Sequence, residues 1–499
     1  MAEAAIAAAP SSAAKSFGAP AYRGYVLLLL TLVYTLNFID RNLLSVIAQP
    51  VIEAFHLSDS EYGFLNGPPF AIFYALMGIP IAMAADRYNR VAIIGLCIAI
   101  WSVMSALCGF ATSFMFLLTA RIGVAIGEAG CTPPANSIIG DYFKASSRAN
   151  ALGVYATGVT IGAALANAFG GPIATGLSGP AVGQWLDGMH FGALSSLIDW
   201  SQVGGWRLAF ILIGAPGIVV ALIVLLTIKE PPRGYSDAPG VARTSKANFA
   251  ETLRELRGKP SFWYMSIGAS LVALAGYGLG GFQAPMAQRV HGIDPGTFAL
   301  QFGVPLSLAA AAGTFLGGFL IEKLTRLFAS AAAWVPAVGL LLAVPLYEYA
   351  FFEPTERLAE ARWMWCVGAA LHYAYLSSQY TIGQGVVSVR SRASAVAIVL
   401  LLIALIGNGL GPQIVGWLSD MFMGQQLAAL DPSGALTSDI CRARDAVAHL
   451  PEAQQAICHT AYGEGLRQSM AATALFFIPA AVCFIFSALT LKKDMVAKH

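Results

Sequence analysis

The stretch AMAADRYNR, residues 82–90, has a counterpart in GFLIEKLTR, residues 318–326. Both consist of a small residue, three intervening residues, an acid, a base, two further residues and an arginine. Each stretch follows the second apolar segment in its half of the chain. Because the two matches stand at equivalent positions, the sequence predicts a chain built from two parallel repeats.

The composition is that of a protein with many membrane-spanning helices. Of the 499 residues, 57% are hydrophobic and 11% are charged, whereas about a quarter of a soluble domain is charged. The net charge of +2 is too small to indicate nucleic-acid binding. A hydrocarbon core is spanned by about 20 apolar residues. We predict an all-α membrane protein with twelve transmembrane helices in two pseudo-symmetric six-helix lobes around a central cavity, at residues 23–49, 61–85, 90–111, 115–139, 148–171, 206–228, 261–288, 296–321, 329–350, 362–386, 393–419 and 467–491.

The charges of the connecting loops predict the orientation. Lys and Arg gather in the loops that follow even-numbered helices, in the central loop and after the last helix. Because cytoplasmic loops carry an excess of these residues, both termini and the central loop are expected to be cytoplasmic. The first 17 residues lack the apolar core of a signal peptide. We expect an integral protein of the bacterial inner membrane, and an internal organelle membrane remains the alternative.

The predicted organisation has five parts. In the central one, NFAETLRELRGK (residues 248–259) predicts a short amphipathic helix with Asn248 at its N-cap. This helix would lie either on the membrane surface or in solvent as part of the linker. The parts are a disordered cytoplasmic N-terminal tail (1–22), an N-terminal six-helix lobe (23–228), a cytoplasmic linker (229–260), a C-terminal six-helix lobe (261–491) and a cytoplasmic tail (492–499).

Three stretches resemble signatures of the major facilitator superfamily. The first repeat resembles its signature between helices 2 and 3, with Ala82 in place of the usual leading Gly. RIGVAIGEA (residues 121–129) is similar to its helix 4 signature, and GNGLGPQIVG (residues 407–416) to a Gly-Pro-rich signature, here on helix 11. The resemblance covers nearly the whole chain from about residue 23. It implies a secondary transporter whose two lobes rock about a central site, without a soluble cofactor.

Four charged residues interrupt the apolar helices. Asp40 and Arg41 lie in VYTLNFIDRN (residues 33–42), and Arg121 and Glu128 share one face of helix 4 because they are seven residues apart. A charge at the bilayer centre costs about 2.5–3.5 kcal/mol, so each should face a cavity or a partner. In the two-lobed fold these helices line the same cavity, where the four residues would form a cluster of two acids and two bases. The cluster suits proton coupling, or binding of a phosphate or carboxylate by arginine; the alternative is a static salt-bridge network that fixes helices 1 and 4.

The second half of the chain has no matching charge near the centres of helices 7, 8 and 11. Helix 10 carries His372 and Tyr373 in LHYAYLSSQY, and both are candidate cavity-lining residues. One cavity wall is thus predicted to be charged and the other apolar and aromatic. This division would fit a substrate with a polar head group and an apolar tail. For His372 a hydrogen-bonded packing role is the alternative.

The stretch YTLNFIDRN resembles the Spinster branch of the superfamily, in which helix 1 carries an Asn-x-x-Asp-Arg pattern. Spinster-like transporters move lysolipids and sphingosine phosphate, with proton coupling proposed for some members. The resemblance implies that Asp40 and Glu128 are the proton-sensitive acids and that Arg121 is their partner. Arg121, Arg41 and Asn37 are candidates for binding the substrate head group or pairing with the acids. Sister groups that carry sugar phosphates and organic anions share parts of these patterns.

Asp86, Arg87 and Arg90 in the first repeat are candidates for a cytoplasmic gate. In the superfamily this acid meets the start of helix 11 in the outward-open state. Arg390 and Arg392 lie just before that helix, and its N-terminus adds a partial positive charge. Anchoring by the positive-inside rule is the alternative reading of the arginines.

The chain has seven cysteines, of which five lie in apolar runs. Cys441 and Cys458 lie in one loop on the side opposite the termini, which predicts a disulfide, with free thiols as the alternative. No Cys/His cluster indicates a metal site.

No Walker A, HExxH or GxSxG stretch is present, so we do not expect an enzyme. The predicted function is proton-coupled transport of an amphipathic lipid-like anion, of the lysolipid or sphingosine-phosphate type, by alternating access. The runner-up is a carrier of a small organic anion or drug; a passive scramblase or channel and a membrane-bound lipid enzyme are further alternatives. The expected partners are this substrate, protons and membrane lipids, with no nucleic acid, cofactor or metal, and the expected state is a monomer.

Overall fold

The computed structural model describes residues 16–190, 195–196, 198–236, 249–388 and 390–496. Within these ranges the chain forms helices and no strand. Most of the expected N-terminal tail, including residues 1–15, and the linker stretch 237–248 lie outside the described residues.

The helices of the first half build six spans, which we number in chain order. Four of these spans are divided into two or more shorter helices. The spans are α1 (Pro20–Val46); α3 (Asp59–Asn66) with α4 (Pro68–Arg87); α5 (Arg90–Gly109); α6 (Phe114–Ala129) with α7 (Thr132–Tyr142); α8 (Ala145–Leu165) with η1 (Ala166–Gly170) and α9 (Gly171–Gly176); and α12 (Gly205–Gly214) with α13 (Pro216–Thr227). Outside them lie α2 (Ala48–Phe55), α10 (Gly179–Gly188) and η2 (Trp200–Gln202).

The second half repeats this arrangement in spans 7 to 12. They are α15 (Pro260–His291); α16 (Pro295–Phe298) with η3 (Ala299–Gly303) and α17 (Val304–Thr325); α18 (Ala331–Phe352); α19 (Leu358–Tyr373) with α20 (Tyr375–Gly385); α21 (Arg392–Leu402) with η5 (Ile403–Leu410) and α22 (Gly411–Leu430); and α25 (Glu452–Ala474) with α26 (Phe477–Asp494). Outside them lie α14 (Phe249–Arg257), η4 (Thr355–Arg357), α23 (Ser438–Arg442) and α24 (Arg444–Ala448).

Eleven of these helical spans are long and apolar enough to cross a membrane. The remaining predicted helix, 362–386, is present as α19 and α20, which meet at Ala374. The structure therefore confirms the all-α membrane fold with two six-helix lobes.

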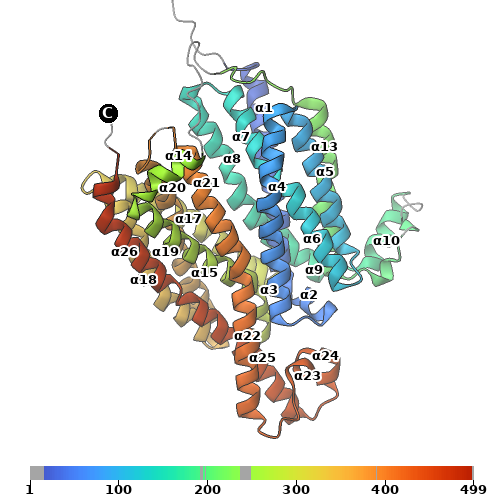
Figure 1. Ribbon diagram of the computed structural model, residues 1–499. Coiled ribbons are helices and arrows are strands. Elements are labelled where there is room, and N and C mark those ends of the chain that lie inside the picture. The colour runs from blue at the N-terminus through green and yellow to red at the C-terminus, as the bar shows by residue number, and fades with distance from the viewer. Residues whose placement is uncertain (1–15, 191–194, 197, 237–248, 389, 497–499) are drawn as a thin grey trace, which may run out of the picture.

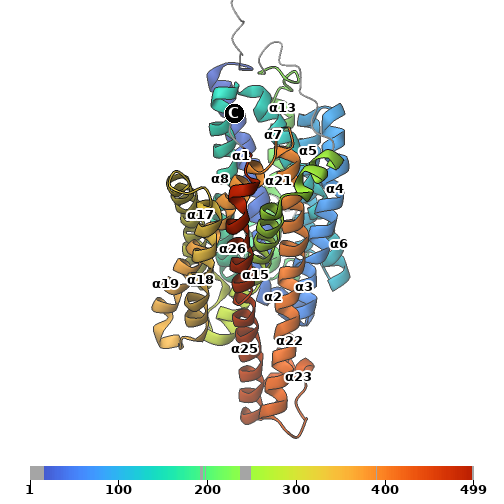
Figure 2. The same cartoon turned by 60° about the vertical axis from the view of Figure 1, so that its left-hand side comes forward.

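The two lobes lie side by side, with the blue-to-teal first half next to the yellow-to-red second half (Figure 1). We call the face that carries α14 and the described ends of the chain the terminal face. The opposite face, which carries α2, α23 and α24, is called the loop face. Figure 2 shows that α22 and α25 run together toward the loop face beyond the rest of the bundle.

Spans 2 and 11 join the lobes near the loop face. A Cβ on Gly67, between α3 and α4, would lie 2.5 Å from the carbonyl oxygen of Gly409. Only glycine permits this close approach of the two backbones. The contact lies in the stretch GNGLGPQIVG, where the helix has the wider π-helical turn η5.

Spans 11 and 12 are longer than their apolar stretches predict. Helix was expected to end at residue 419 and to resume at 467, but α22 continues to Leu430 and α25 begins at Glu452. Cys441 and Cys458 form a disulfide with a Cα–Cα distance of 4.9 Å, which ties α23 to α25. A small core around this disulfide, including Met423 and Val447, supports the polar extension outside the main bundle.

The short helix expected in the linker is α14. It packs against the C-terminal lobe, with Leu256 fully buried. The Glu255 carboxylate accepts hydrogen bonds from the backbone N–H and the hydroxyl of Ser388 at 2.6 and 3.1 Å. The indole N–H of Trp263 also donates to the Leu256 carbonyl at 3.0 Å. These contacts attach the linker to the ends of spans 7 and 10.

Candidate functional site

The four intramembrane charges meet between α1 and α6 as two ion pairs. The Arg41 guanidinium donates to one oxygen of Glu128 from Nη2 at 2.8 Å and from Nε at 3.1 Å. Arg121 Nη1 lies 3.8 Å from Asp40 Oδ2. Neighbours in sequence on α1 thus pair with residues two turns apart on α6. The structure brings together the four residues that the sequence predicted to form a cluster.

Several polar atoms of this cluster have no hydrogen-bond partner among the described residues. They are Asp40 Oδ2, Glu128 Oε1, and Nε and Nη1 of Arg121. Asp40 Oδ1 accepts a hydrogen bond from the Ser105 hydroxyl. Buried polar groups are usually satisfied, and an unsatisfied one is costly in a low-dielectric interior. The cluster therefore retains capacity for a proton on an acid or an anion on Arg121.

Aromatic rings surround the two arginines. The Arg41 guanidinium carbon lies 5.0 Å from the Phe38 ring centroid, 5.2 Å from that of Phe70 and 4.8 Å from that of Tyr74. Arg121 lies 5.3 Å from the Phe70 centroid. Ring faces attract cations within about 6 Å. The cage stabilises the cations without neutralising them, so they can still attract an anion.

A cavity of about 600 Å³ separates this cluster from the second lobe. Arg41 and Arg121 line it from the first lobe. The acids Asp40 and Glu128 are almost fully buried behind the arginines and do not line the cavity. Asn37 is also buried on α1, one turn before Arg41, and does not line it.

The wall supplied by the second lobe is largely apolar and aromatic. His372 lines it and shares a hydrogen bond of 2.7 Å between its Nδ1 and the Tyr347 hydroxyl. The His372 ring stacks on Phe477 at a centroid distance of 5.1 Å. His372 is therefore both a hydrogen-bonded packing residue and a cavity-lining residue, the two roles that the sequence left open. The wall further includes Tyr373, Tyr277, Leu306, Trp365 and Phe298.

A second polar network joins the lobes at the loop face. The Asp59 carboxylate at the start of α3 receives two hydrogen bonds of 2.7 Å from the Arg289 guanidinium at the end of α15. Asp420 on α22 accepts from the backbone N–H groups of Asp59 and Ser60 at 3.1 and 2.9 Å. An acid of the second lobe thereby caps a helix N-terminus of the first lobe, where negative charge is favourable. We call Asp59, Ser60, Arg289 and Asp420 the loop-face lock.

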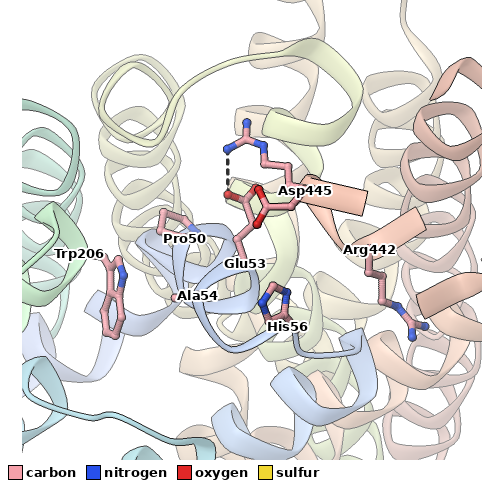
Figure 3. A pocket seen from close by; sticks show the side chains of 8 residues that line it. Pro50, Glu53, Ala54, His56, Trp206, Arg442 and Asp445 are labelled. Atoms are coloured by element: carbon pink, nitrogen blue, oxygen red, sulfur yellow. Dashed lines mark hydrogen bonds and ion pairs between the residues drawn. The ribbon is translucent and has the colours of Figure 1, made fainter. Parts of the chain in front are cut away.

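A shallower pocket of about 370 Å³ lies beside the lock, between α2 and the segments α23 and α24. Figure 3 shows Glu53, His56 and Arg442 around it. An ion pair of 3.0 Å joins Glu53 to Arg444, and another of 2.8 Å joins Arg442 to Asp420. The disulfide-bonded segment therefore reinforces the lock from outside.

The candidate gate residues lie apart from the cavity at the terminal face. Asp86 and Arg87 are exposed, and so are Arg390 just before span 11 and Arg392 at its first position. Arg90 is instead buried, with side-chain bonds to its own lobe and to the start of the linker. These bonds run to Glu230 at 2.6 Å, Asp141 at 2.5 Å, Ser137 at 2.7 Å and the Pro231 carbonyl at 2.7 Å. The structure thus separates Arg90 from the two exposed residues of the repeat, and the gate role remains a prediction.

The sequence did not predict the loop-face lock or the aromatic cage. Asp59 and Arg289 stand at helix ends near loops, where charge needs no special explanation. Phe70 and Tyr74 are ordinary apolar-helix residues until Arg41 is placed beside them. Among the described residues, no group of three or more His, Cys, Asp or Glu is placed to hold a metal ion.

Two six-helix lobes with buried charges beside a central cavity are the architecture of a membrane transporter. The sequence matches the Major Facilitator Superfamily over residues 30–412, and the chain belongs to this family. Within it, the chain is Spinster-like. A crystal structure of a bacterial homolog of the human lysosomal transporter Spinster, inward-facing and unoccupied, superimposes with a TM-score of 0.90 at 53% identity, over 97% of this chain and 100% of that one.

Two relatives of known family agree with the placement of the chain in this superfamily. An MFS-type efflux pump of Mycolicibacterium smegmatis is 31% identical over 424 residues, which cover 83% of this chain and 90% of the relative. Protein spinster of Drosophila melanogaster is 24% identical over 497 residues, covering 94% of this chain and 77% of that protein.

Proposed function

We propose that this protein is a proton-coupled carrier of an amphipathic anion of the lysolipid or sphingosine-phosphate type. The observation that carries the proposal is the division of the central cavity. Its first-lobe wall presents Arg41 and Arg121, while its second-lobe wall is built mainly from aromatic and aliphatic side chains. A phosphate head group and an apolar tail need these two environments within one cavity.

The head group would bind at Arg121. Two of its guanidinium nitrogens lack a hydrogen-bond partner among the described residues, and the 3.8 Å distance to Asp40 leaves room for competition. A phosphate oxygen that approached Arg121 would weaken the attraction of this arginine for Asp40. Protonation of Asp40 would then become easier, which would link anion binding to proton uptake.

The coupled proton would be carried by Glu128 or Asp40. Glu128 already bonds Arg41 through one oxygen, while its other oxygen is unpartnered. Protonation of this carboxyl would remove its charge and weaken its bond to Arg41. Since these residues connect α1 to α6, the change would alter the packing of the helices that line the cavity.

The transport cycle would alternate between the two faces of the protein. We propose that the terminal face is cytoplasmic in a bacterial inner membrane, and that the lobes are shown here in the inward-open state. The closed loop-face lock and the exposed Asp86 support this assignment. So does the similarity to an inward-facing Spinster homolog. In the outward-open state the lock would separate and Asp86 would approach the start of span 11.

The substrate class is tested by uptake of a fluorescent lysolipid into proteoliposomes that contain the full chain. Wild type should accumulate the lysolipid, and Arg121→Gln should lose most of this uptake. Arg326→Gln is the matched control, since Arg326 is exposed at the surface and should be unaffected. If wild type takes up no lysolipid but does take up small organic anions, and Arg121→Gln abolishes that uptake, the second candidate below would replace the lipid proposal.

That second candidate is a proton-coupled carrier of a small organic anion or drug. The Mycolicibacterium relative named an efflux pump favours it, because it is similar over 83% of this chain. The arginine pair would bind such an anion in the same way. The apolar second-lobe wall would then accommodate the aromatic part of the molecule instead of an acyl chain.

A further inference from the structure

The connection between spans 5 and 6 forms a small structure of its own at the loop face. The chain leaves span 5 at Gly176 and enters span 6 at Gly205, and between them lies α10. Figure 1 shows α10 beside the bundle, at the level of the loop-face helix ends, rather than over the lobes. The helix is therefore tied to the ends of the two spans that it connects.

One side of α10 packs on the connection itself. Gly183 is buried against the Trp200 side chain, whose indole N–H donates to the Ser195 carbonyl at 3.0 Å. The Ser195 hydroxyl in turn donates to the Gly183 carbonyl at 3.4 Å. These contacts give the helix one inner side.

An apolar stripe runs along the outer side. Trp185 on α10 and Met189, which caps its C-terminal end, are 61% and 53% exposed, and Ala181 lies one turn before Trp185. Leu177, 40% exposed, lies in the extended segment just before the helix. Residues four apart lie on one side of a helix. The exposed polar residues Gln184 and Asp187 lie on a different side. The helix and its C-cap thus present a large indole and one flexible apolar side chain outward, next to a polar edge.

We propose that this stripe is an interfacial anchor, which inserts into the boundary between head groups and acyl chains of the leaflet at the loop face. An indole with an apolar body and a polar N–H is favoured at this depth. The adjoining spans also expose apolar side chains, with Phe169 55% and Leu212 40% exposed. Residues 177–203 contain no Lys or Arg, so the anchor would bind by apolar burial and not through anionic lipids.

The anchor would hold the connection between spans 5 and 6 at a fixed depth while the lobes move. Span 5 contributes Ala156, Thr160 and Asn167 to the central cavity. A fixed point at its loop-face end would make this span pivot during transport instead of shifting along the membrane normal.

The test is tryptophan fluorescence of the full chain in bilayers whose lipids carry bromine near the start of the acyl chain. Subtracting the spectrum of Trp185→Phe from that of wild type isolates the Trp185 component. We expect bromolipid to remove most of this component's intensity and iodide in the buffer to remove little. Trp417, 60% exposed on span 11, supplies the matched comparison through Trp417→Phe.

Two outcomes would overturn the proposal. Strong iodide quenching without bromolipid quenching would place Trp185 in solvent. In the second outcome, Trp185 is protected from both quenchers, and native mass spectrometry shows a dimer that Trp185→Phe abolishes. This result would show that a second copy of the chain covers the stripe. Because Trp185 is exposed, the variant should fold as wild type does, with unchanged thermal unfolding as the check.

Discussion

The Asp59 carboxylate of the first lobe and the Arg289 guanidinium of the second form two hydrogen bonds of 2.7 Å each. Both side chains are almost fully buried, at 2% and 3% exposure. The Arg289 guanidinium also lies 3.7 Å from the Tyr462 ring centroid and donates from Nε to Gln49 at 2.8 Å. The pair is thus satisfied on all sides only while the lobes touch at the loop face.

Replacing Arg289 by Met should open the loop face. Removing one partner of a buried pair costs about 3–5 kcal/mol, and the cost falls on the state in which the lobes touch. Electron-spin distance measurements between labels on the loop-face ends of spans 2 and 11 should show a larger population of long distances. Arg326→Met removes an exposed pair with Glu322 and should leave the distances unchanged. The same distances in wild type and Arg289→Met would contradict the lock.

Substitutions of Arg90 and of Asp86 should have different effects on thermal stability, although both residues belong to the repeated stretch. Arg90→Gln leaves Asp141 and Glu230 without their shared cation, so thermal unfolding should occur at a clearly lower temperature. Asp86→Asn changes an exposed side chain and should leave the unfolding temperature nearly unchanged while transport falls. Equal loss of stability in both variants would refute this division of roles.

The disulfide between Cys441 and Cys458 should hold the segment that reinforces the lock. It closes a loop with a sequence separation of 17 residues, and a loop of this size corresponds to about 3 kcal/mol. In the double variant Cys441→Ser/Cys458→Ser, amide hydrogen exchange should accelerate in α23, α24 and the first turns of α25. Cys483→Ser, at a free cysteine, is the control. Unchanged exchange in the double variant would mean that the small core alone holds the segment.

Docking of α14 should not depend on pH in the physiological range. Burial alone would raise the pKa of the Glu255 carboxyl, but hydrogen bonds from Ser391 and Ser388 lower it below its ordinary value. A lowered pKa means that the stabilisation is fully present above the ordinary glutamate pKa of about 4.3 and is lost as pH falls through the lowered value.

Hydrogen exchange in α14 should therefore change little between about pH 8 and 5, once corrected for the intrinsic exchange rate. Glu255→Gln should raise it across that range, because it removes the carboxylate that accepts from Ser388. A transition in wild type near neutral pH would contradict the assignment.

The sequence predicted the lobes and the membership of the charge cluster. The resemblance implied Arg121 as the partner of both acids, whereas in the structure Arg121 lies beside Asp40 and Glu128 pairs with Arg41. Spacing on one helix places Arg121 and Glu128 on the same face, and insertion cost requires them to find partners. Which acid meets which arginine depends on the rotation and depth of α1 against α6, which no local pattern encodes. The crossed pairing of Arg41 with Glu128 therefore required the structure.

Other features lay beyond prediction for different physical reasons. Asp59 and Arg289 are far apart in sequence, and each occupies a position where an unpaired charge would be unremarkable. The beginning of α25, EAQQAICHT, is polar enough to read as a loop. It is helical because the disulfide and the contact with α22 stabilise it. The hydropathy of the sequence carries no information about either contact.

The central claim, that the buried acids couple transport to protons, is tested most directly by lysolipid accumulation in proteoliposomes with and without a pH gradient. It should be measured for wild type, Glu128→Gln, Asp40→Asn and the exposed control Glu322→Gln. We predict that the gradient drives accumulation in wild type and in the control, and that at least one cluster variant loses the driven part while retaining passive exchange. Equal accumulation with and without the gradient in wild type, unchanged in both cluster variants, would show that the pairs of Arg41 with Glu128 and of Arg121 with Asp40 only hold helices together.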